Sequence, residues 1–130
     1  MAITMYSYID FCRAKMSNNL LFVTCDHIIA PIGEQVFVVL GKDRLLYVNI
    51  ESEKGKEIAI RIVKKKAWNI KLVKARKYSK QVAYTIPKKF AKVLKINKGD
   101  ILLLLGNEYE LQVIPIKQIL DKIIACIGKF

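Results

Sequence analysis

The sequence predicts a mainly β chain with a helix near its C-terminal end. Short runs rich in β-branched residues recur along the chain, separated by Gly, Asn and Asp, a pattern typical of strands and hairpins. Hydrophobic residues make up 53% of the 130 positions, enough to bury a core. Residues 116–127 instead space their apolar side chains by three and four positions, as one face of a helix does.

The first third of the chain carries the weakest signals. Ser7–Met16 is predicted as a short helix, because Tyr8, Phe11 and Cys12 would lie near one face. Leu20–Thr24 is predicted as a strand, and Pro and Gly residues indicate that a connecting loop follows it.

The middle of the chain is predicted to be β structure. Val36–Leu40 and Leu45–Ile50 flank a turn that begins at Gly41, the arrangement of a hairpin. Ile58–Val63 follows a polar turn, and its β-branched residues favour a strand over a helix. Residues 1–66 are therefore interpreted as a β-rich N-terminal region of unknown role.

The second half is predicted to run strand, basic link, strand, short helix and hairpin. Asn69–Ala75 and Gln81–Ile86 are the first two strands. Pro87 stands where the helix would begin, since its fixed φ suits the first turn. After a Gly-Asp turn, Ile101–Leu105 and Tyr109–Ile114 form the closing hairpin.

Positive charge is concentrated in one part of the sequence. The net charge is +12, yet residues 58–99 hold 14 basic and no acidic residues, while the segments on either side are each close to −1. A solvated surface normally mixes both signs, so this segment predicts binding to a polyanion. An anionic membrane is the weaker alternative, because the segment indicates strands and one short helix rather than a long amphipathic helix.

Residues 69–116 resemble the AbrB/MazE/SpoVT swapped-hairpin family. The most specific part is TIPKKFAKVLKINKGD, residues 85–100, which is similar to the family's Ile-Pro, basic helix, leucine and Gly-Asp core. The resemblance implies a swapped-hairpin, AbrB-like dimeric barrel in the C-terminal half, which binds double-stranded DNA. A module of about 50 residues buries too little surface alone, and forming a homodimer is one remedy. The expected domains are thus 1–66, 67–116 and a C-terminal amphipathic helix over 117–130.

In that family, basic residues of the first strand, the link and the helix contact DNA. The matching positions here hold Lys74, Arg76, Lys77, Lys80 and Lys92. Three neighbouring lysines complete the predicted DNA-binding set, namely Lys71, Lys88 and Lys89.

The chain departs from the family pattern at positions that affect specificity. Ala83 and Ala91 stand where the family commonly has basic residues, and Arg61 and Arg76 are the arginines of the basic segment. Arginine reads guanine with a bidentate fork, whereas lysine acts on phosphate as a point charge. We therefore expect a transcription regulator that grips the DNA backbone with limited sequence specificity.

Catalysis, metal binding and cofactors are not expected. Cys25-Asp26-His27 contains the single histidine of the chain, whereas a metal site normally needs three or four ligands. Three cysteines without Cys-x-x-Cys spacing fit a reducing cytoplasm better than a disulfide framework. No secretory signal and no membrane span are expected, so the predicted location is the cytoplasm.

Several alternatives stay open. RNA could replace DNA as the polyanion. The C-terminal helix could pack on its own domain or form a dimer contact. It could also bind a protein partner, as in the antitoxin branch of the family, whose tail is usually extended and acidic. Trp68 and Tyr78 are interpreted as barrel or interface aromatics, with stacking on bases as the alternative. The richness in Ile and Lys would suit an archaeal or viral protein.

Overall fold

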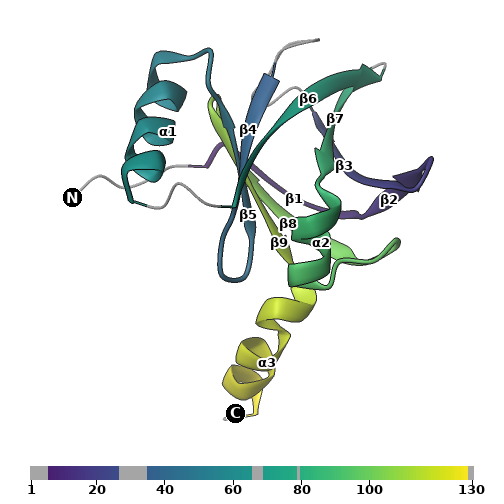
Figure 1. Cartoon of the computed structure of the whole chain (residues 1–130). Coiled ribbons are helices and arrows are strands. Elements are labelled where there is room, and N and C mark those ends of the chain that lie inside the picture. Colours follow the sequence, from purple (N-terminus) through teal and green to yellow (C-terminus); the bar gives the residue numbers. More distant parts are fainter. Residues whose placement is uncertain (1–5, 27–34, 66–68, 79, 129–130) are drawn as a thin grey trace.

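A computed structural model describes residues 6–26, 35–65, 69–78 and 80–128 (Figure 1). Within these ranges, nine strands form one sheet in the order β1-β8-β9-β5-β4-β6-β7-β3-β2, with antiparallel neighbours. The strands are β1 (Tyr8–Arg13), β2 (Lys15–Ser17), β3 (Leu20–Asp26), β4 (Gln35–Leu40), β5 (Leu45–Asn49), β6 (Ile70–Tyr78), β7 (Gln81–Ile86), β8 (Ile101–Gly106) and β9 (Glu110–Pro115). The helices are α1 (Glu53–Lys65), α2 (Lys88–Leu94) and α3 (Ile116–Ile127). The prediction of a mainly β chain is confirmed.

The sheet curls into a nearly closed barrel. Its two outermost strands, β1 and β2, are consecutive in the chain and are separated by Ala14 alone, so the two edges of the sheet meet there. Side chains that point inward form one core that draws on both halves of the chain. Within it, the Tyr47 hydroxyl donates to the Thr85 carbonyl oxygen at 2.9 Å, and the rings of Tyr47 and Tyr84 lie 5.6 Å apart.

The prediction of a helix over Ser7–Met16 was wrong, because this segment forms β1 and β2. β1 pairs along its whole length with β8, from Tyr8 opposite Gly106 to Arg13 opposite Ile101. The backbone N–H and C=O groups of β1 form their hydrogen bonds with a strand that is distant in the sequence, and the local spacing of apolar residues does not reveal such a partner. The following turn did carry a signal, since Asn18 and Asn19 both have positive φ, as in a type I′ hairpin turn.

The prediction of a strand over Ile58–Val63 was also wrong, because these residues belong to α1. The Ser52 hydroxyl caps the helix by accepting a hydrogen bond from the Gly55 amide at 2.9 Å. Ile58 and Ile62 are partly buried one helical turn apart, on the side of α1 that packs against β5. The four-residue spacing of these apolar side chains, which places them on one face of a helix, outweighs the preference of β-branched residues for strands.

The order of elements predicted for the second half is confirmed. The first strand is longer than predicted, because β6 extends to Tyr78 and so includes Arg76 and Lys77 of the expected basic link. β6 and β7 form the hairpin, and α2 follows Pro87 and ends at Lys95, which has a φ of 58°. In the Gly-Asp turn, the Asp100 carboxylate accepts a hydrogen bond from the Asn97 amide at 2.7 Å. β8 and β9 then pair as predicted.

The two halves of the chain are related by a two-fold axis, and each strand pairing in one half has an equivalent in the other. In register, residues 8–26 correspond to residues 69–87, and residues 35–49 correspond to residues 101–115. Thus β1 pairs with β8 as β6 pairs with β4, and β4 pairs with β5 as β8 pairs with β9. β3 pairs with its own counterpart β7, and β5 pairs with β9.

This relation bears on the expected domains and on the expected dimer. The expected boundary at residues 66–67 does not separate two sheets, because strands from both sides of it interleave in one sheet. Where the swapped-hairpin resemblance implies a second protomer, the strands beside residues 69–115 come from residues 8–49 of the same chain. A homodimer stays a prediction.

α3 leaves the barrel after Pro115 and projects away from it (Figure 1). Its first turn is anchored, since Lys117 pairs with Asp100 at 2.8 Å and the Gln118 amide donates to the Leu94 carbonyl at 2.7 Å. Further along the predicted apolar stripe, Leu120 and Ile124 are exposed. The helix therefore packs on its own domain through its first turn.

Among the described residues, no helix has both the length and the apolar character needed to cross a membrane.

Candidate nucleic-acid interface

The β6–β7 hairpin carries the first group of predicted residues. Lys74 and Arg76 lie on either side of Ala75, which is 1% exposed and faces the core, so both cations point outward. Lys77 lies near the end of β6, and Lys80 lies just before β7. All four side chains are exposed.

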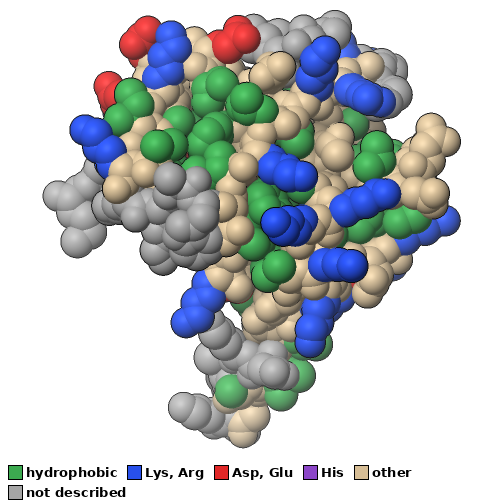
Figure 2. Space-filling view, viewed as in Figure 1, with side chains coloured by type: hydrophobic (Ala, Val, Ile, Leu, Met, Phe, Trp, Pro, Cys, Tyr) green, Lys and Arg blue, Asp and Glu red, His purple; other side chains and the backbone are tan. Residues whose placement is uncertain are grey.

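α2 carries the second group on its outer side. Phe90 and Leu94 are buried, which fixes the helix on the barrel, while Lys88, Lys89 and Lys92 are exposed. The remaining predicted residue, Lys71, is exposed at the start of β6. All eight predicted DNA-binding residues are thus at the surface. Figure 2 shows Lys and Arg side chains gathered over β6, β7 and α2, with the acidic side chains of this view at the α1 end.

Local carboxylates do not neutralise this basic face. The ion pairs found among the described residues are Asp43–Arg44, Glu53–Lys56 and Asp100–Lys117, and none involves a predicted DNA-binding residue. Cations without such partners remain available to phosphate oxygens.

A hollow of about 390 Å³ opens between β2 and β6, on the outer side of β3 and β7. Its floor includes Phe22, Thr24 and Ala83, and Lys15 and Arg76 line it from the two flanking strands. The Lys15 ammonium donates to the Thr24 hydroxyl at 2.8 Å. The hollow therefore joins a residue of the predicted site to a residue from the N-terminal region.

Lys15 is a residue that sequence reasoning missed, and so is Arg13. Counting charge over residues 1–57 hid both, because the acidic residues of that segment outnumber its basic ones. A signal was nevertheless present in the sequence, since Arg13-Ala14-Lys15 mirrors Lys74-Ala75-Arg76. The central alanine is buried in both triplets, so the two flanking cations face outward in both.

A second hollow, of about 540 Å³, lies between the β2–β3 turn and α2. Its apolar side chains include Leu21, Ile86 and Ile96, and Lys88 and Lys92 also line it. Two residues of the predicted site therefore border a recess rather than a flat surface.

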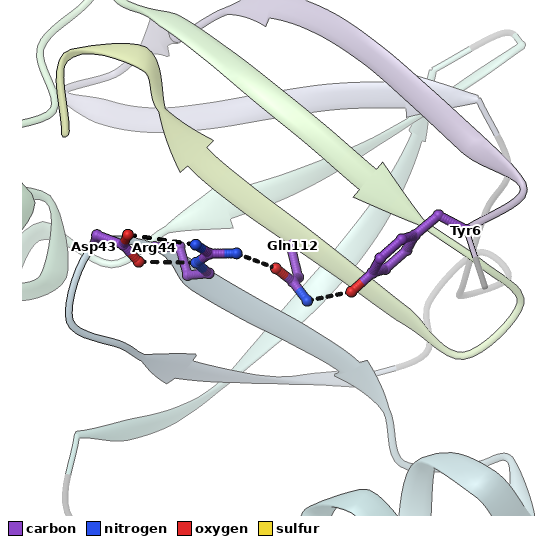
Figure 3. Close-up of polar contacts among 4 residues, drawn as sticks. All are labelled: Tyr6, Asp43, Arg44 and Gln112. Carbon is purple, nitrogen blue, oxygen red and sulfur yellow. Dashed lines mark hydrogen bonds and ion pairs between the residues drawn. The ribbon is translucent and has the colours of Figure 1, made fainter. Parts of the chain in front are cut away.

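A polar network connects the β4–β5 turn, β9 and the segment before β1 (Figure 3). Asp43 accepts hydrogen bonds from the Arg44 guanidinium, and this contact raises the pKa of Arg44. Arg44 also donates to the Gln112 Oε1 at 2.7 Å, and the Gln112 Nε2 donates to the Tyr6 hydroxyl. The sheet order places β5 and β9 far from β3 and β7, so this network lies outside the basic face.

The residues considered for catalysis or metal binding do not form a site within the described ranges. Cys25 is buried, and burial raises the pKa of its thiol to about 12, which leaves the group protonated and weakly nucleophilic. No group of three or more His, Cys, Asp or Glu residues there could hold a metal ion. His27, Trp68 and the Tyr78 side chain lie outside the described residues.

Comparison of the chain with protein-family models, with curated proteins and with solved structures finds no match. The residue pattern and the geometry therefore carry the functional argument.

Proposed function

We propose that this chain is a DNA-binding protein that holds the backbone of double-stranded DNA on the basic face formed by β6, β7 and α2. The observation that carries the proposal is the exposure of all eight predicted cations, none of them in an ion pair among the described residues. Phosphate neutralisation by such cations releases condensed counterions and supplies most of the affinity of backbone binding. The swapped-hairpin resemblance favours DNA over RNA and a role in transcription regulation.

Limited sequence specificity is part of the proposal. Arg76 is the arginine among the eight residues, and the others are lysines. Lysine contacts phosphate without the planar fork that distinguishes guanine, so these residues position the protein on a duplex more than they read its bases. The barrel beneath them holds the cations on ordered strands and a helix, which limits the entropy lost on binding.

A salt titration of binding to a random duplex tests the proposal. If each of the eight cations contacts a phosphate, the logarithm of the affinity should fall with the logarithm of the salt concentration at a slope of about −7. A slope shallower than about −2 would contradict backbone binding. The same titration with single-stranded DNA and RNA identifies the preferred polyanion, and preference for RNA would replace DNA in the proposal.

Two substitutions test whether the assigned residues form the binding site. Arg76→Ala and Lys80→Ala should each reduce the magnitude of the slope by about 1. Lys54→Ala is the matched control, because Lys54 is exposed on α1 and lies outside the basic face. Affinity unchanged in both site variants would reject the assigned face.

A further inference from the structure

We infer that the N-terminal half completes the DNA site, so that a single chain carries both of its two-fold-related halves, with Arg13 and Lys15 as additional phosphate contacts. This inference rests on the proposed function and adds a second set of residues to it. Its basis is the strand register, which places each of these residues at the position of a predicted contact in the other half.

The register relates the two sets of cations directly. Arg13 lies opposite Ile101 as Lys74 lies opposite Gln35. Lys15 lies opposite Phe22 as Arg76 lies opposite Ala83. Arg13 is thus the counterpart of Lys74, and Lys15 is the counterpart of Arg76.

One cation of each set, Lys15 and Arg76, faces the same hollow from opposite sides. Arg13 lies beside it, with its guanidinium donating to the Gly99 carbonyl at 3.0 Å. The two-fold axis passes through the pair formed by Val23 and Tyr84, which are both fully buried beneath the hollow. Thr24 and Thr85, which correspond to each other, both line the hollow, as do Lys15 and Arg76. The hollow is therefore centred on the axis, with one cation of each half on either side of it.

The separation of the two sides suits a duplex. β2, β3, β7 and β6 are consecutive in the sheet, so β2 and β6 lie at most about 14 Å apart at a spacing of about 4.8 Å per strand. This distance is close to the width of the major groove of B-DNA, about 12 Å. Cations on both sides can then contact phosphates of both DNA strands, whereas one set of cations would contact one strand.

The two halves are unequal in charge. The positions of Lys77 and Lys80 are occupied in the first half by Met16 and Asn19. The N-terminal set is therefore the smaller contributor, and its loss should weaken binding without abolishing it.

Lys15→Gln is the first test, because glutamine keeps most of the side-chain length and can still donate a hydrogen bond to Thr24. Loss of one phosphate contact should weaken binding to a duplex roughly eight-fold at about 0.1 M salt and reduce the magnitude of the slope by about 1. Lys42→Gln is the matched control, since Lys42 is an exposed N-terminal-half lysine on the β4–β5 turn, outside the hollow. Thermal unfolding of each variant separates a lost contact from a lost fold.

Stoichiometry is the second test. The mass of the complex on a duplex of one short site, measured by native mass spectrometry, should correspond to one chain. Two chains on that duplex, or affinity of Lys15→Gln equal to that of Lys42→Gln, would overturn the single-chain site. In either case, weaker duplex binding by Arg76→Ala would still support the proposed function. Unchanged binding by Arg76→Ala and Lys80→Ala would instead reject both the proposed function and the single-chain site.

Discussion

Glu110 is a buried carboxylate that makes the stability of this fold depend on pH. Its side chain is 7% exposed, and burial raises its pKa, although a hydrogen bond from Asn107 acts in the opposite direction. A group whose pKa is raised on folding stabilises the protein below the pKa of the unfolded chain, and this contribution is lost as the pH rises through the folded value. The charged form of Glu110 therefore opposes folding.

Glu110→Gln should raise the free energy of unfolding at pH 7.5, because the amide keeps the shape of the side chain without the buried charge. The gain should shrink towards pH 4, where protonation removes the charge from the wild type. Urea denaturation at both values measures this difference. Glu108→Gln is the control at an exposed neighbouring position, and an equal gain at both pH values would contradict the role assigned to ionisation.

At the level of elements, α1 shows why β-branched residues misled the prediction. Ile58, Ile60 and Ile62 alternate as in a strand, yet Ser52 caps a helix and Gly55 fits against the turn before it. The second half was predicted correctly because its turns and its Pro87 carry local signals. β1 could not be predicted in the same way, since its partner β8 lies about 90 positions away in the sequence.

Gly55→Ala should destabilise the protein despite the higher helix propensity of alanine. A Cβ at position 55 would lie 1.7 Å from the Asn49 carbonyl oxygen, and overpacking costs about 1 to 3 kcal/mol. The propensity gain is at most about 1 kcal/mol, so the clash should dominate. Gly128→Ala is the control, because its Cβ would come no closer than 3.4 Å to the helix backbone. Chemical denaturation compares the two, and equal stability would contradict the packing described for α1.

On the scale of the whole molecule, closure of the barrel within one chain determines how it unfolds. Both halves contribute to one core, so neither half should retain its structure when the other is lost. The midpoint of thermal unfolding should therefore be independent of protein concentration, unlike that of an obligate dimer. Scanning calorimetry over a hundred-fold range of concentration measures this, and a midpoint that rises with concentration would indicate that a second chain is needed.

The candidate site was partly accessible from the sequence at this scale. Sequence reasoning found the eight residues of the second half, from the count of charge together with the family resemblance, and the structure places all of them at the surface. It missed Arg13 and Lys15, because their relation to Lys74 and Arg76 depends on strand register across the whole barrel. The similarity of the two triplets in the sequence gains a meaning only when the two-fold axis is seen to relate them.

Because the two-fold relation lies within one chain, its two halves can also change independently in evolution. In a symmetric homodimer, every substitution appears twice and alters both halves of the binding surface together. Here a substitution alters one half alone, and the corresponding turn positions already differ, with Lys80 in one half and Asn19 in the other. Under the proposed function, the contacts that the two halves make with a duplex therefore need not be identical.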